Sequence, residues 1–123
     1  IAVGSETVVN MVPLDFEEFL WANGITTPVL DMLHRSLDQE IPVPEALHLR
    51  LNELLRQYAV VGGLPEVVET YVQTHDLNAV LAKQQEILKD YEENLFVAVN
   101  KRARAKLKTV LDAVPLQLNK ENK

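Results

Sequence analysis

The spacing of apolar residues along this chain is helical nearly throughout, and one interruption divides two apolar stripes. The first stripe ends in a pair of glycines, Gly62 and Gly63, and Pro65 then opens the second stripe. Glycine commonly ends a helix in the left-handed region, and proline commonly occupies the first helical position. The pattern therefore predicts one helix that ends at the glycines and another that begins at Pro65. The first stripe contains Leu47, Leu51, Leu54, Leu55, Tyr58 and Val61, and the second contains Val67, Val68, Tyr71 and Val72.

Start signals of three further helices stand elsewhere in the chain. Asp15 followed by Glu18 is typical of a capping box. A second start signal is Thr27, which is expected to act as the cap before Pro28, and Asp76 is expected to cap the longest helix. The helix after Pro28 is expected to bury the stripe formed by Leu30, Leu33 and Leu37.

The two ends of the chain differ in character. Residues 1–12 are rich in valine and favour extended structure. A helix is predicted from Lys101 to Val114, with Pro115 as its break. The predicted fold class is all-α, an irregular bundle of about six helices with a short extended N-terminal segment.

Composition restricts the classes of function. The chain has 123 residues, 47% of them hydrophobic, and a formal net charge of -6, which argues against unspecific affinity for nucleic acid. The absence of cysteine excludes disulfides, thiolate metal sites and a cysteine nucleophile. No apolar run approaches the roughly 18 residues of a membrane span, and no signal peptide is evident. These features favour a cytoplasmic setting without a membrane partner.

The turn at Gly62, Gly63 and Pro65 is the first candidate site. Glycines bring backbone amides close to an approaching group, and the N-terminal end of a helix is partially positive. Such a corner is suited to an anion such as a phosphate. The alternative is a helix–helix corner with no ligand.

Two of the three histidines have the spacing of candidate metal ligands. His34 and His48 each follow a carboxylate by three residues, Asp31 and Glu45, as in the helices of di-iron bundles. The longest predicted helix offers no inward carboxylates to complete such a site, so ordinary surface histidines and no metal site are expected. His75 has no evident partner in the sequence.

A cluster of basic residues begins the last predicted helix, and it is a candidate for contact with phosphate or nucleic acid. A solvated face is the favoured interpretation, because no aromatic or glycine-rich element is interleaved. No phosphate-binding loop or nucleophile elbow is present, and no catalytic residue is assigned. The cluster consists of Lys101, Arg102, Arg104, Lys106 and Lys108.

Four motifs in fixed order resemble a large prokaryotic family of AAA-type P-loop ATPases that have a C-terminal domain of unknown function. The motifs are PLDFEEFL at residues 13–20, YAVVGGLPEVV at 58–68, QEILKDY at 85–91 and VPLQLNKENK at 114–123. The resemblance covers nearly the whole chain. It departs at Asn94, near which the family usually has an aspartate after the tyrosine that Tyr91 matches, so a role for that acid is in doubt here.

The resemblance implies a division of the chain and a role for the glycine corner. Residues 1–12 would be the extended tail of an ATPase core, and residues 13–123 the helical lid and the start of the C-terminal domain. The P-loop, the Walker B strand and sensor 1 would precede residue 1. The stretch 62–65 is similar to the Gly-x-Pro motif that related ATPases place next to the nucleotide, which implies cofactor contact at Gly62, Gly63 and Pro65.

The function that follows is that of a lid which closes over ATP and relays its state, and which catalyses nothing alone. ATP and Mg would bind to the full-length parent, itself an ATPase, and the missing core would be the partner of this chain. The alternative is a helical interaction module that binds a partner protein or nucleic acid without nucleotide. A valine in place of Gly63 is expected to weaken nucleotide binding, because a β-branched residue resists a positive φ.

Overall fold

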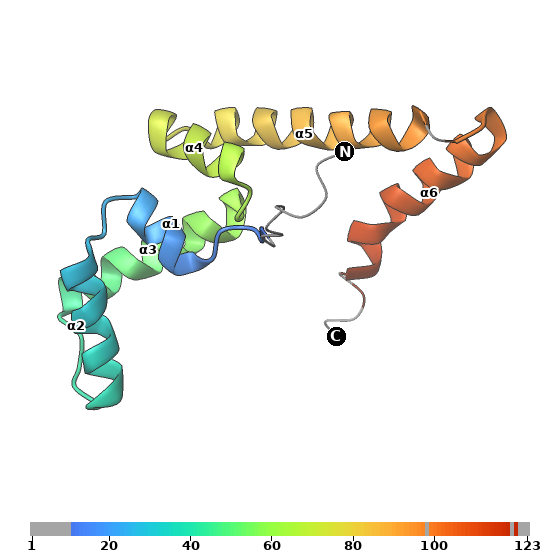
Figure 1. Ribbon diagram of the computed structural model, residues 1–123. Helices are drawn as coiled ribbons and strands as arrows, with labels where there is room; N and C mark the ends of the chain where they lie inside the picture. Colours follow the sequence, from blue (N-terminus) through green and yellow to red (C-terminus); the bar gives the residue numbers. More distant parts are fainter. Residues whose placement is uncertain (1–10, 98, 119, 121–123) are drawn as a thin grey trace, which may run out of the picture. The chain divides into compact units, whose positions relative to one another are not determined.

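The computed structural model describes residues 11–97, 99–118 and 120, and these form six helices and no strand (Figure 1). The prediction of an all-α fold is therefore confirmed. An extended segment was expected at residues 1–12, and residues 1–10 of it lie outside the described part of the chain. The helices are α1 (Phe16–Ala22), α2 (Thr27–Asp38), α3 (Glu45–Val61), α4 (Pro65–Thr74), α5 (Leu77–Val97) and α6 (Lys101–Leu118).

The chain divides into two compact units, residues 1–83 and residues 84–123. The first unit contains α1 to α4 and the start of α5, and the second contains the rest of α5 and α6. Within the described part of the chain, no helix is both long enough and apolar enough to cross a bilayer.

The helix starts follow the local signals in the sequence. The Asp15 carboxylate accepts a hydrogen bond from the Glu18 amide at 2.9 Å, and the Glu18 carboxylate accepts one from the Asp15 amide at 2.9 Å. This reciprocal pair confirms the capping box of α1. The Asp76 carboxylate accepts from the Asn78 amide at 2.8 Å and so caps α5, while α4 begins at Pro65 as predicted.

Three details of the prediction were wrong. The N-cap of α2 is Thr26, so Thr27 and Pro28 both lie inside the first turn. Pro115 lies inside α6, because a proline in the last turn removes only one backbone hydrogen bond before the helix ends. Leu37 is 78% exposed, since α2 joins the core only through its buried residue Leu30.

The core of the first unit is an aromatic cluster where α1, α3 and α4 contact one another in pairs. The ring of Phe19, which is fully buried, lies 5.2 Å from the ring of Tyr58 and 5.9 Å from that of Tyr71. Phe16 also packs against Tyr58, at 5.6 Å between ring centroids, and lies 6.5 Å from Phe19. A seven-residue helix is unstable alone in water. Packing of these rings therefore holds α1 on the two longer helices.

Candidate functional site

The corner between α3 and α4 begins at Gly62, which adopts a conformation that other residues avoid. Its φ is 74° and its ψ is -170°, and its amide donates to the Tyr58 carbonyl at 2.8 Å. The positive φ was predicted, but the backbone is extended at ψ and does not lie in the left-handed helical region. This combination is essentially restricted to glycine. It directs the chain straight from the end of α3 towards the start of α4.

Gly63 is a glycine for a different reason, namely the close approach of another backbone. Its carbonyl accepts a hydrogen bond from the Leu14 amide at 2.7 Å. A Cβ atom at Gly63 would collide with the carbonyl oxygen of Leu14 and would lie 3.0 Å from Cβ of Pro13. The expected positive φ at Gly63 was wrong, since Gly24 and Gly62 are the positive-φ glycines among the described residues. The absent side chain gives the room that the Leu14 backbone needs.

Tyr58 completes the attachment of Leu14. Its hydroxyl donates to the Leu14 carbonyl at 2.7 Å, so both backbone polar groups of Leu14 are hydrogen-bonded to residues at the end of α3. The Tyr58 ring packs against both Phe16 and Phe19. One side chain thus joins the aromatic core of the first unit to the glycine corner.

The start of α4 offers fewer amides to a ligand than the sequence suggests. Pro65 has no N–H group, and the amides of Val67 and Val68 both donate to the Leu64 carbonyl at 3.0 Å. Glu66 places a carboxylate in the first turn, where its negative charge interacts favourably with the helix dipole. The same charge repels an anionic ligand. The predicted site residues Gly62, Gly63 and Pro65 do form one corner, but the described contacts of the two glycines are made with this chain itself.

Each of the three histidines contacts a residue that was not considered as its partner from the sequence. Nε2 of His34 is 3.7 Å from a carboxylate oxygen of Glu17, and Nε2 of His48 is 2.9 Å from the side-chain amide of Asn52. Nδ1 of His75 lies 3.0 Å from the carbonyl of Tyr71. His75 thus has a partner that the sequence did not suggest. Among the described residues, no group of three or more histidine, aspartate and glutamate side chains is arranged to hold a metal ion.

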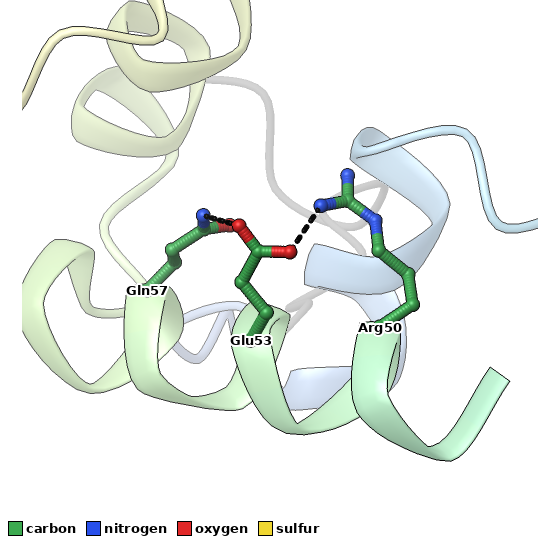
Figure 2. A network of polar contacts seen from close by, with 3 residues as sticks. All are labelled: Arg50, Glu53 and Gln57. Atoms are coloured by element: carbon green, nitrogen blue, oxygen red, sulfur yellow. Dashed lines mark hydrogen bonds and ion pairs between the residues drawn. The ribbon is translucent and has the colours of Figure 1, made fainter. Parts of the chain in front are cut away.

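A polar network follows the exposed side of α3 (Figure 2). The Arg50 guanidinium lies 3.0 Å from one carboxylate oxygen of Glu53, and the Gln57 amide donates to the other at 3.4 Å. Oε1 of Gln57 is buried and has no hydrogen-bond partner in the described part of the chain. Burial raises the pKa of nearby Tyr71 above 10.0, Arg50 lowers it, and Glu53 raises it further. The charges of Arg50 and Glu53 therefore act on Tyr71, which belongs to the aromatic core.

The basic cluster of α6, which is Lys101, Arg102, Arg104, Lys106 and Lys108, is exposed along its whole length. Nε of Arg104 donates to the Val99 carbonyl at 3.0 Å, and Nζ of Lys108 lies 3.9 Å from a carboxylate oxygen of Glu92 on α5. Asn100 caps the helix by accepting from the Ala103 amide at 3.1 Å. Cations in the first turn of a helix are unfavourable, because this end is already partially positive.

Two residues of the corner were not singled out as site residues from the sequence. Leu14 is one position of the motif at residues 13–20, and Tyr58 is one position of an apolar stripe. Nothing local indicates that a backbone amide near the start of the chain bonds to a glycine carbonyl after α3. The adjacent pair of glycines was the available signal, because two glycines together allow another backbone to come close.

Comparison with known proteins assigns a family and no activity. Residues 52–123 match the family described as Domain of unknown function (DUF8612). No curated protein matches the chain, and no solved structure matches it. Since the matched residues are more than half of the chain, the protein belongs to the DUF8612 family.

Proposed function

We propose that this chain is the helical lid segment of a cytoplasmic AAA-type ATP-binding protein. In this proposal the corner at Gly62, Gly63 and Pro65 lies beside the bound nucleotide, and the lid relays the nucleotide state to a C-terminal domain. ATP and Mg are bound by the core of the parent protein, and the chain described here catalyses nothing alone. Its partner is the ATPase core of the same protein.

The contact of Leu14 with Gly63 is the observation that supports this proposal best. It brings the motif at residues 13–20 into backbone contact with the motif at residues 58–68, so two motifs of the resemblance form one structure. In this proposal, the chain that leads from the core reaches the helices at the glycine corner. Any displacement of the corner is then transmitted to that connection through two hydrogen bonds.

The corner fits a wall beside a nucleotide and does not fit a phosphate cradle. Residues 61–68 contain no lysine or arginine, and Glu66 adds negative charge in the first turn of α4. Binding of a triphosphate needs cations and a metal-holding carboxylate around the phosphates. In this proposal the core supplies the cations and the metal-holding carboxylate. The corner only closes the nucleotide site.

A second candidate function is a helical interaction module that binds a partner protein or nucleic acid without nucleotide. The exposed basic cluster of α6 favours it, since cations on one helix match an anionic surface. The two candidates differ in one expectation. Substitution in the glycine corner should change ATP binding or hydrolysis if the chain is a lid, and the interaction module needs no nucleotide.

The test compares two glycine variants in the longest protein that the reading frame of this chain encodes. Gly62→Ala and Gly24→Ala each place a side chain at a positive φ, +74° and +82°, and neither position has an atom within 4 Å of a new Cβ. We expect Gly62→Ala to weaken ATP binding or hydrolysis by roughly tenfold. Gly24→Ala should leave both nearly unchanged when they are measured per folded molecule. Circular dichroism checks that both variants remain helical.

Three results would overturn the lid proposal. One is equal nucleotide kinetics in the two glycine variants, which leaves the corner with a structural role alone. Another is the absence of ATP binding and hydrolysis in the long protein, which favours the interaction module. Hydrolysis by the 123-residue chain alone would also contradict the proposal, since it assigns no catalytic group to these residues.

A further inference from the structure

The second unit shows no core among its described side chains. Residues 84–97, 99–117 and 120 include no buried side chain. Seven of its large apolar side chains are between 45% and 82% exposed. Two helices gain most of their stability from buried apolar faces, so a pair without a core is poorly stabilised alone. The seven residues are Leu88, Tyr91, Leu95, Val97, Val110, Val114 and Leu116.

These apolar residues are ordered along the two helices. Leu88, Tyr91 and Leu95 follow one another by three and four residues, which places them on one face of α5. Val110 and Val114 are four residues apart and share a face of α6. An open groove of about 400 Å³ lies between the helices, and it is lined by Leu88, Glu92, Leu111, Asp112, Val114 and Pro115.

We propose that a second copy of this chain covers this surface, so that two α5–α6 hairpins pack into a four-helix bundle. Bundles of two helical hairpins bury their apolar faces in this way. The five exposed apolar side chains on these two faces present an area on the order of 500 Å² per copy, close to the apolar part of the roughly 800 Å² per partner that a stable interface buries. The apolar surface is thus of the size that a dimer requires.

The charges of the hairpin also favour a second copy. The part of α5 in this unit carries four acids and one lysine, whereas the first half of α6 carries the five cations of the basic cluster. Within the part of the chain that the structure describes, Lys101, Arg102 and Lys106 have no ion-pair partner. In a two-fold interface each copy offers the same surface to the other. An acidic α5 can then lie along the basic α6 of the partner twice, which gives Lys101, Arg102 and Lys106 carboxylates to pair with, beside the Lys108–Glu92 pair within each copy. The acids are Glu86, Asp90, Glu92 and Glu93.

Sedimentation equilibrium of the 123-residue chain tests the proposal, over concentrations from about 1 to 100 μM, where interfaces of this size span monomer and dimer. We expect a monomer–dimer equilibrium. Leu95→Glu should raise its dissociation constant by roughly tenfold or more, because it buries a charge in the interface. Leu49→Glu is the matched control, since Leu49 is also an exposed helical leucine, on α3 in the first unit.

A second measurement keeps the test independent of the folding of the variants. In a mixture of isotope-labelled and unlabelled chains, filtered nuclear Overhauser spectra should show contacts between copies from the methyl groups of Leu88, Val110 and Val114. A monomer at every concentration overturns the proposal, as does a dimer that Leu49→Glu weakens as much as Leu95→Glu. A monomer that binds a DNA or RNA oligonucleotide through the basic cluster overturns it in favour of nucleic acid as the occupant.

Discussion

The backbone of Leu14 lies directly against the backbone of Gly63, and the Leu14 amide donates a 2.7 Å hydrogen bond to the Gly63 carbonyl. The contact joins a residue that precedes α1 to the corner between α3 and α4. It also explains why the second of the two glycines is a glycine, although its φ is not positive. The Gly62–Gly63 pair therefore serves two separate physical needs, one conformational and one steric.

Replacement of Gly63 by alanine tests the steric need. We expect Gly63→Ala to lower the free energy of unfolding by roughly 1–3 kcal/mol, the usual cost of forcing an extra carbon into a packed site. Urea titration measures this loss, and amide hydrogen exchange should show faster exchange at Leu14. Gly24→Ala is the control, because it strains the backbone in open space and should leave the Leu14 amide protected. Equal protection of Leu14 in both variants would contradict the assignment.

Removal of the Tyr58 hydroxyl tests the second attachment of Leu14. Tyr58→Phe keeps the ring among Phe16 and Phe19 and deletes only the donor to the Leu14 carbonyl. We expect the free energy of unfolding to fall by about 0.5–1.5 kcal/mol in urea titrations. Tyr91→Phe is the matched control, since Tyr91 is 59% exposed, and it should change stability little. A loss of the same size in both variants would show that the bond contributes nothing.

The alkaline stability of the first unit tests the burial of Tyr71. Its pKa in the folded chain is raised above 10.0, chiefly by burial. The unfolded chain therefore loses the Tyr71 proton at lower pH than the folded chain does. The contribution of Tyr71 is complete below its ordinary pKa and is lost as pH rises through the folded pKa. Tyr71→Phe should thus show a smaller fall in unfolding free energy above about pH 10 than the parent chain shows. The measurement is the free energy of unfolding against pH for the parent chain and Tyr71→Phe, with Tyr91→Phe as the control. Parallel curves for the parent chain and Tyr71→Phe would contradict this expectation.

The parts of the fold that the sequence predicted are those determined within one helical turn. The capping box of Asp15 and Glu18 involves residues three apart, and Pro65 starts its helix because of its own ring. These signals need no knowledge of the rest of the chain. The same holds for Asp76, whose carboxylate caps the turn that follows it.

The parts that the sequence did not predict depend on residues far apart along the chain. The steric reason for Gly63 is the Leu14 backbone, which no local pattern places there. His34 lies beside Glu17 of the preceding helix, and not with the carboxylate in its own helix that the spacing suggested. The candidate site was therefore located correctly as a corner, while the function of each glycine in it required the tertiary contact.

The attachment of Leu14 to Tyr58 has a consequence for synthesis of the chain on the ribosome. The two residues are 44 positions apart, so α1 is synthesised well before the residue that holds it. At about 5–20 residues per second, this delay is roughly 2–9 seconds. During that interval Phe16 and Phe19 have no ring of α3 to pack against. The start of this domain is thus an aromatic segment that must wait for its partner helix, and a chaperone that shields such segments would meet it first here.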